Sequence, residues 1–201
     1  MARRHWLAVV MVLASLSPLA EGRAQDSTRA PASPAYSTMS VGIAGGRTID
    51  DGALADFWDS GTTLRLDVYT RFHRGDVGAW LLTLPWDARS AEQPDFRAYI
   101  FGLDWRFTRS VTRWLRPSAS VSAGNFLSTF EGVETKGLKK ESEIFIGASA
   151  GLAVGVTRAT SLTATVTGIN VFTSTPIRTT FATVGVSHGF ATPGWLRGVF
   201  E

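Results

Sequence analysis

The sequence predicts an all-β fold, an eight-stranded antiparallel up-and-down transmembrane β-barrel, and three observations lead to this prediction. Apolar and polar residues alternate along several segments, as they do in strands with one apolar and one polar face. After residues 1–24, no stretch offers the roughly 18 consecutive apolar residues of a spanning helix. Short and long connections alternate between the expected strands, which is typical of a barrel with two different ends.

The N-terminus has the layout of a cleaved secretory signal peptide. It begins with Arg3 and Arg4, continues through the apolar run 6–20, and ends in small residues around Ala24. The apolar run includes serines and a proline and is shorter than the roughly 20 residues that span a membrane. The expected organisation is a signal peptide over 1–24, a flexible leader over 25–35, the barrel over 36–190 and a C-terminal tail over 191–201.

Strand periodicity is clearest in the segment 62–72. There Leu64 and Leu66 share one face, while Arg65 and Asp67 share the other. Helical spacing would mix these two sets, and the β-branched, aromatic and glycine-rich composition also favours strands. The eight expected strands are Tyr36–Gly46, Thr62–Phe72, Val77–Trp86, Phe96–Phe107, Trp114–Phe126, Glu143–Val156, Leu162–Phe172 and Thr180–Phe190.

The connections between these strands fall into two classes. Three are turn-sized, namely 73–76, 108–113 and 157–161, whereas 47–61, 87–95 and 127–142 are longer and 173–179 is intermediate. Outer-membrane barrels have short periplasmic turns and longer exterior loops. The alternation slips at Pro117 and at Gly168–Ile169, so a bulge or a late strand start is expected at each place.

The apolar strand faces are expected to point outward, towards lipid. In the alternative, a soluble lipocalin-like cup, the apolar faces line a ligand cavity and the polar faces meet water. An eight-stranded barrel has room inside only for packed side chains, which favours bulky aromatics on the outside. Aromatic residues near strand ends would form two interfacial girdles. The expected interfacial aromatics are Phe72, Trp80, Trp86, Tyr99, Trp105 and Phe107.

The polar strand faces carry charges that are expected to meet inside the barrel. Unpaired buried charge is costly, so a plug of salt bridges is favoured over a narrow ion or proton path. The expected lumen cluster consists of Arg65, Asp67, Arg71, Asp104, Arg106 and Arg116.

The last expected strand carries Thr183, Gly185, His188 and Phe190, which resemble the terminal signal read by the barrel-assembly machinery. With the strand pattern over 36–190, the chain resembles the small outer-membrane β-barrels of the OmpA transmembrane domain and OmpX type. His188 and the residues after Phe190 depart from that pattern. The resemblance implies an outer-membrane location, with lipid, lipopolysaccharide and the assembly machinery as partners.

Composition excludes several classes of function. Residues 1–24 hold Arg3, Arg4, Arg23 and Glu21, and the remainder has 17 basic and 16 acidic residues, so no nucleic acid is expected as a partner. The absence of cysteine excludes a disulfide scaffold, a thiolate metal site and a cysteine nucleophile. No glycine-rich phosphate loop or metal-spaced histidine cluster occurs, so no cofactor is expected.

Enzymatic chemistry also finds little support. After the expected signal peptide the chain has only His73 and His188, and adjacent strand residues such as Ser187 and His188 point to opposite faces. The connections 47–61 and 87–95 are rich in aspartate and glutamate, and we expect these charges simply to be solvated. Divalent-ion bridging to lipopolysaccharide, or ligand contact through Phe57 and Trp58, is the weaker hypothesis. The expected role is non-enzymatic: structural, adhesive or loop-based binding. A lipid A-modifying enzyme and a soluble carrier of an apolar ligand remain the alternatives.

Overall fold

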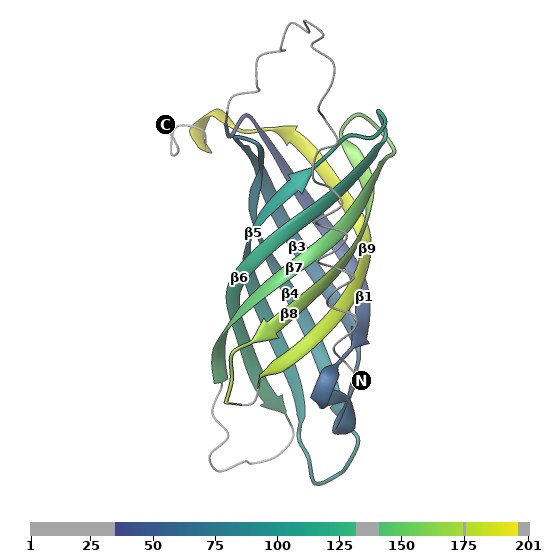
Figure 1. Cartoon of the computed structure of the whole chain (residues 1–201), viewed down its shortest axis with the longest axis vertical. Helices are drawn as coiled ribbons and strands as arrows, with labels where there is room; N and C mark the ends of the chain where they lie inside the picture. The colour runs from purple at the N-terminus through teal and green to yellow at the C-terminus, as the bar shows by residue number, and fades with distance from the viewer. Residues whose placement is uncertain (1–34, 132–140, 175, 197–201) are drawn as a thin grey trace, which may run out of the picture. The chain divides into compact units, whose positions relative to one another are not determined.

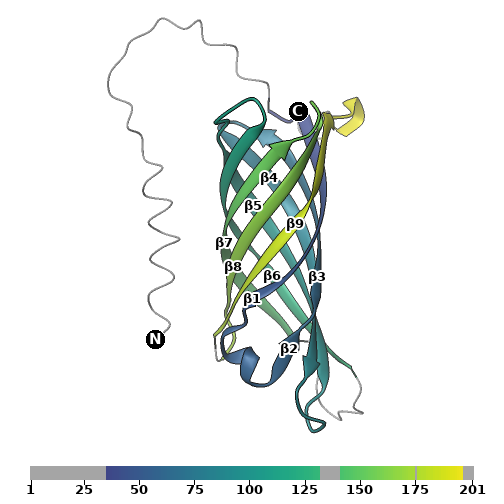
Figure 2. The ribbon, with the colours of Figure 1, turned by 90° about the vertical axis from the view of Figure 1, so that its right-hand side faces the viewer.

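The computed structural model describes residues 35–131, 141–174 and 176–196, and within these ranges the chain forms a closed antiparallel β-barrel (Figures 1 and 2). Eight strands build the wall: β1 (Thr38–Asp50), β3 (Thr62–Phe72), β4 (Gly75–Ala88), β5 (Asp95–Thr108), β6 (Leu115–Glu131), β7 (Glu141–Gly155), β8 (Thr160–Val171) and β9 (Ile177–Ala191). A short 3-10 helix, η2 (Gly52–Asp56), and the short strand β2 (Trp58–Ser60) lie between β1 and β3.

Each wall strand pairs with the wall strand before and after it in sequence, and β1 pairs with β9 to close the ring. The small strand β2 pairs only with the end of β4. The predicted eight-stranded up-and-down barrel is therefore confirmed. No helix among the described residues is long and apolar enough to cross a membrane.

The two ends of the barrel differ in their connections. The β3–β4, β5–β6 and β7–β8 turns share one end with the start of β1 and the end of β9, and we call this the short-turn end. The opposite end carries η2, β2 and the β4–β5 connection, and we call it the long-loop end. The β3–β4 turn contains only His73 and Arg74, because Phe72 already pairs with Gly75, and His73 takes the left-handed backbone conformation (φ 46°).

Neither Pro117 nor Gly168–Ile169 carries a bulge. Pairing with both neighbouring strands runs unbroken through Gly168–Ile169, and at Pro117 the pairing with β7 is continuous, whereas the pairing with β5 starts late, at Ser118. The Pro117 carbonyl accepts a hydrogen bond from the Arg109 N–H, just past the end of β5. The nitrogen of Pro117 therefore faces the β5 side too, where the regular pairing has ended, so the proline removes no hydrogen bond from the β6–β7 pairing. At Ile169 the alternation slips because an apolar side chain points inward, with no irregularity of the backbone.

The outer face of the barrel is apolar on every wall strand. Phe101 is 50% exposed and Leu103 is 61% exposed, whereas the inward-facing Arg65 on β3 is buried. The predicted assignment of inside and outside is therefore correct for the strands that defined it. Exposed aliphatic residues that represent β1 and β3 to β9 in turn are Ile43, Leu66, Leu81, Leu103, Val121, Ile146, Val166 and Val184.

The long-loop half of the lumen holds an apolar core that the sequence analysis did not foresee. Its buried side chains are Trp80, Leu82, Leu84, Trp86, Phe96, Ala98, Ile100, Phe126, Phe145, Ile169, Val171 and Phe181. Trp80 packs against Phe145 and Phe181, with ring centroids 5.6 and 6.4 Å away. Trp86 stacks on Phe96 at 5.5 Å.

This core corrects the prediction that Trp80 and Trp86 are interfacial. They are 2% and 1% exposed and lie inside the barrel. The cause is strand register: β4 is apolar on both faces, and the two-residue turn sets Trp80 opposite the inward-facing Asp67. Gly102 on β5 pairs with Trp80 and makes room for it, because a Cβ there would lie 2.5 Å from Cε2 of the indole.

Candidate functional site: the polar half of the lumen

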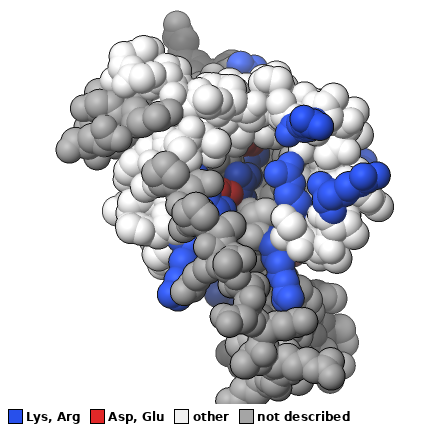
Figure 3. Space-filling model, turned by 90° about the horizontal axis from the view of Figure 1, so that it is seen from above, with Lys and Arg blue, Asp and Glu red and all other residues white. Residues whose placement is uncertain are grey.

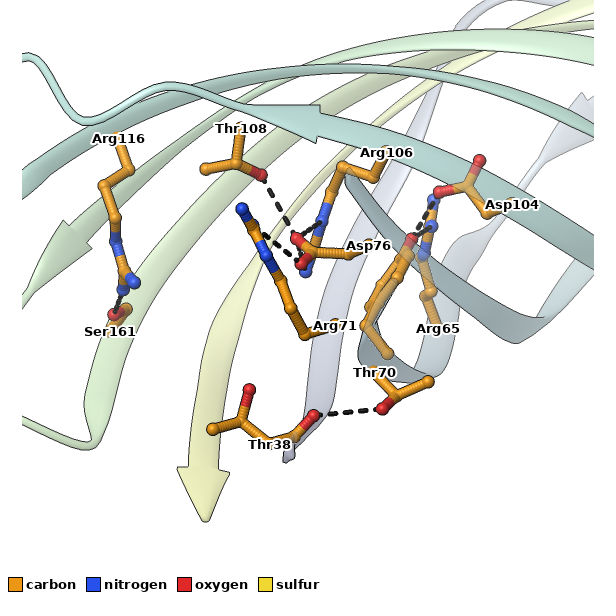
Figure 4. A network of polar contacts seen from close by, with 11 residues as sticks. Thr38, Arg65, Thr70, Arg71, Asp76, Asp104, Arg106, Thr108, Arg116 and Ser161 are labelled. Atoms are coloured by element: carbon orange, nitrogen blue, oxygen red, sulfur yellow. Dashed lines mark hydrogen bonds and ion pairs between the residues drawn. The ribbon is translucent and has the colours of Figure 1, made fainter. Parts of the chain in front are cut away.

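The short-turn half of the lumen is lined by charged and hydroxyl-bearing side chains. Strand β3 contributes Arg65, Asp67, Tyr69 and Arg71, which share one face because strand side chains alternate. The neighbouring strands add acidic, basic and serine or threonine side chains to the same space (Figure 4).

The inner part of this region is a buried network around Tyr69. Its hydroxyl donates to Oδ2 of Asp104 at 2.6 Å and accepts from Nη2 of Arg65 at 3.2 Å. Arg65 also lies 3.7 Å from the Asp67 carboxylate and donates to the Thr167 hydroxyl at 3.3 Å. Arg65 and Asp104 are only 4% and 5% exposed, so their charges are neutralised within the barrel and away from water.

A second network, nearer the short-turn end, is centred on Asp76 of β4 (Figure 4). Its carboxylate lies 3.5 Å from Nη1 of Arg71 and 3.2 Å from Nη2 of Arg106, and it accepts from the Thr108 hydroxyl at 3.3 Å. The guanidinium of Arg106 lies 3.6 Å above the centre of the Tyr69 ring. Arg106 therefore joins the two networks.

Beyond Asp76 the lumen opens into a cavity of about 450 Å³, which we call the mouth cup. Its charged lining residues are Arg71, Arg106, Arg116, Arg158 and Asp76. Seen from the short-turn end, basic side chains surround a hollow in which an acidic side chain is visible (Figure 3). The described residues include no lysine, so these basic groups are arginines.

The structure brings most of the expected lumen cluster together. Arg65, Asp67 and Asp104 meet in the inner network, and Arg71 and Arg106 meet at Asp76. Arg116 stands apart from the expected cluster, because it donates to the Ser161 hydroxyl at 2.6 Å on the other side of the cup.

Two central residues, Tyr69 and Asp76, were missing from the expected cluster. Tyr69 was detectable, since it shares a strand face with Arg65. Asp76 was placed in a four-residue turn. With a two-residue turn, hairpin register puts Asp76 opposite Arg71, as the structure does.

The other expected interfacial aromatics all belong to the outward-facing sides of β3 and β5. Trp105 and Phe107 are exposed and stack on each other at 5.4 Å near the short-turn end. Phe72 lies at that end too, whereas Tyr99 lies nearer the long-loop end. Their placement at a lipid interface stays a prediction.

The expected assembly-signal residues lie on β9. Thr183 and Gly185 are on its inward side, while His188 and Phe190 are on its outward side. The His188 Nδ1 atom lies 3.0 Å from the hydroxyl of its cross-strand partner Thr160. Recognition by an assembly machinery is untested by this arrangement.

Within the described part of the chain, neither His73 nor His188 forms a nucleophile–base pair with a serine. Ser187 belongs to the inward face of β9, opposite to His188. His73 lies in the β3–β4 turn and contacts the Phe72 ring at 4.3 Å. Among the described residues, no group of three potential metal ligands lies together.

At the long-loop end, one of the two loop aromatics that the sequence analysis singled out is packed and the other is exposed. Trp58 donates from Nε1 to the Pro94 carbonyl at 3.0 Å and meets Phe96 edge-on at 5.2 Å, so it supports the loops rather than reaching for a ligand. Phe57 remains exposed. Arg89 bonds to Asp59 at 2.6 Å, and this hydrogen-bonded ion pair raises the pKa of the Arg89 guanidinium. The expected signal peptide and most of the expected leader lie outside the described residues.

A closed eight-stranded barrel with an apolar outer face and a filled lumen defines the structural class. A scan against protein-family models and a search of curated protein sequences each find no match. Solved structures do match. Neisserial surface protein A has a TM-score of 0.57 at 15% identity, with 78% of this chain and 99% of that chain covered.

Two further structures have the same fold. For the outer-membrane protein OprG from Pseudomonas aeruginosa, the TM-score is 0.53 at 10% identity, covering 78% of this chain and 97% of that chain. For Ail, the attachment invasion locus protein of Yersinia pestis, solved with the heparin analogue sucrose octasulfate, it is 0.52 at 16% identity, covering 78% and 99%. The chain therefore shares the fold of small outer-membrane β-barrels.

Proposed function

We propose that this protein is an integral outer-membrane β-barrel of a double-membraned bacterium, non-enzymatic and non-conducting, with a structural, adhesive or binding role. The observation that carries the proposal is the apolar outer face, which is exposed on all eight wall strands. Soluble proteins rarely expose a contiguous apolar surface of this kind, whereas lipid requires it. The similarity to Neisserial surface protein A, OprG and Ail supports the same location.

The filled lumen supports a barrel that neither conducts nor carries an apolar ligand. Its long-loop half is occupied by fully buried aromatic and aliphatic side chains, including Trp80, Phe145 and Phe181. The space that remains open is the polar mouth cup, which does not suit an apolar ligand. The alternative function as a lipid A-modifying enzyme is less well supported, because His188 and Ser187 face opposite sides of β9 and do not form a nucleophile–base pair.

The adhesive or binding role is assigned to the loops at the long-loop end. Two of the segments there, 47–61 and 87–95, are acidic, and the first exposes Phe57; the matched Ail structure is that of an attachment invasion locus protein. Loops carried by a rigid barrel are suited to contact a partner without disturbing the wall.

A charge placed on the outer face tests the membrane location. Leu103→Arg introduces a cation at an exposed site midway along β5, and Thr62→Arg is the control at the long-loop end of the outward face of β3. In a bilayer the first variant should lose about 2–4 kcal/mol of folding free energy and the second about 0–1 kcal/mol. The measurement is urea unfolding in phospholipid vesicles, read by the mobility of unboiled samples on gels.

A soluble barrel would tolerate both substitutions alike and would fractionate without detergent, which would overturn the proposal. Planar-bilayer recordings test the non-conducting lumen separately. The expected result is no single-channel current from the wild-type protein, and a stable conductance would contradict this part alone.

A further inference from the structure

We propose that the mouth cup binds a small molecule bearing phosphoryl or carboxylate groups. Four arginines line the cup, namely Arg71, Arg106, Arg116 and Arg158, together with the single carboxylate of Asp76. Guanidinium groups present several N–H donors in a plane and form strong charge-assisted hydrogen bonds with oxyanions. The cup therefore has an excess of exactly the donors that an anionic ligand needs.

The distribution of partners within the cup sharpens this point. Asp76 is shared between Arg71 and Arg106. On the opposite side, Arg116 bonds only to the neutral Ser161 hydroxyl, and neither it nor Arg158 has a carboxylate partner among the described residues. Two arginines thus keep their charge available to a ligand, while the other pair is partly neutralised.

The shape and the remaining lining also fit a small polar ligand. The volume of about 450 Å³ falls within the roughly 300–1,000 Å³ typical of small-molecule sites. Hydroxyl groups of Thr108, Ser118, Thr163 and Ser187 line the same space and can donate to or accept from a hydroxylated ligand.

The cup is closed at its inner end. Tyr69 and Arg106 line both the cup and a smaller cavity of about 50 Å³ next to Arg65 and Asp67, and the apolar core lies beyond the inner network. A recess lined mainly by charges of one sign concentrates their field on a ligand that enters from the short-turn end. The claim that this end faces the periplasm rests on the proposed function; binding itself does not.

Calorimetric titration of the protein in a non-ionic detergent tests the proposal, with sodium pyrophosphate and sodium citrate as probes at constant ionic strength. Saturable one-to-one binding of at least one probe is expected, and the preferred probe distinguishes phosphoryl from carboxylate ligands. Arg116→Gln combined with Arg158→Gln should raise the Kd at least about tenfold, because two charge-assisted contacts are lost.

Two further variants separate a binding site from a merely fragile fold. Arg113→Gln removes an exposed arginine of the β5–β6 connection, three residues before Arg116, that does not line the cup, and should change the Kd less than about twofold. Asp76→Asn should lower the Kd, because it frees Arg71 and Arg106 from their counter-charge. A structural defect would not strengthen binding.

The proposal is overturned if neither probe binds saturably, if Arg113→Gln weakens binding as much as the double variant, or if Asp76→Asn weakens it. These outcomes are independent of the membrane test, since Leu103→Arg reports on the outer face. A soluble barrel with a functional cup and a membrane barrel with an inert cup therefore give different combinations of results.

Discussion

In the long-loop half of the barrel the lumen is filled by indole, phenyl and aliphatic side chains, whereas in the short-turn half it is crossed by arginines, aspartates and hydroxyl groups. The apolar half gains free energy from burial without needing any particular orientation. In the polar half each buried charge must be paired, and the cost of removing these charges from water leaves buried ion pairs with little net contribution to stability.

The comparison separates stability from chemistry within one small barrel. Packing around Trp80 holds the wall together and blocks the lumen. The networks around Tyr69 and Asp76 fix charged groups in place and leave the mouth cup open. Substitutions in the apolar half should therefore change mainly the free energy of unfolding, while those in the mouth cup should change mainly ligand binding.

Trp80→Ala should have the largest effect on stability. Removal of a fully buried indole leaves a cavity between Phe145 and Phe181 and should cost about 3–5 kcal/mol. Urea unfolding in detergent micelles measures the loss. Trp105→Ala, which removes an exposed indole from the outer face, is the matched control and should cost less than half as much. Equal losses would mean that the lumen is not the principal core.

Tyr69→Phe should come next, and it probes the polar half. The variant removes the hydroxyl that donates to Asp104 and accepts from Arg65, and both charged groups are buried. Loss of a hydrogen bond to a charged partner should cost about 1.5–3 kcal/mol. Tyr99→Phe on the outer side of β5 controls for the loss of a phenol and should be nearly neutral in the same urea titration. If Tyr69→Phe is also neutral, the inner network does not contribute to stability.

Sequence reasoning succeeded where the two strand faces differ in polarity. On β3 and β5, apolar residues such as Leu66 and Leu103 alternate with charged ones. Only one orientation of these strands places the apolar face towards lipid and the charged face towards the lumen. The same alternation placed five of the six expected lumen charges in or beside the two networks. The orientation of these two strands could be predicted from their own residue pattern, without the register of the neighbouring strands.

The prediction failed where both faces of a strand are apolar. Strand β4 carries Leu82 and Leu84 inward and Leu81 outward, so its own pattern does not distinguish the faces. The missing step was to carry the inward and outward faces of β3 across the β3–β4 turn. A turn of two or of four residues sets Trp80 opposite an inward-facing residue of β3, whereas only the two-residue turn brings Asp76 beside Arg71. The partner of Arg116, by contrast, depends on the registers of both β6 and β8 against the intervening strand β7, which the sequence pattern does not supply.

Gly102→Val tests how tightly the apolar half is packed. A Cβ at this position would overlap the Trp80 ring, which is held by Phe145 and cannot move away freely. Overpacking should outweigh the gain in strand propensity and leave a net loss of about 1–2 kcal/mol. Gly45→Val is the control on the outer face of β1, where the nearest atom to a new Cβ is 3.8 Å away, and it should be neutral or stabilising. Thermal unfolding in micelles compares the two, and a neutral Gly102→Val would show that the lumen can adapt.

Asp51→Asn should have the smallest effect, and it concerns the long-loop end, beyond the wall strands. Burial raises the pKa of the Asp51 carboxyl above its usual 3.8. A pKa raised by folding means that the folded state disfavours the carboxylate more than the unfolded chain does, so stability falls as the pH rises from 3.8 through the folded-state pKa. Asparagine removes this dependence. The variant should be more stable than the wild type by no more than about 0.5 kcal/mol at pH 7, and the difference should vanish once the pH falls below 3.8. Urea unfolding at several pH values measures the difference in free energy of unfolding between wild type and variant.

Asp87→Asn is the control for the change in net charge at the same end. If Asp51→Asn raises the stability equally at every pH, the half-buried carboxylate carries no desolvation cost.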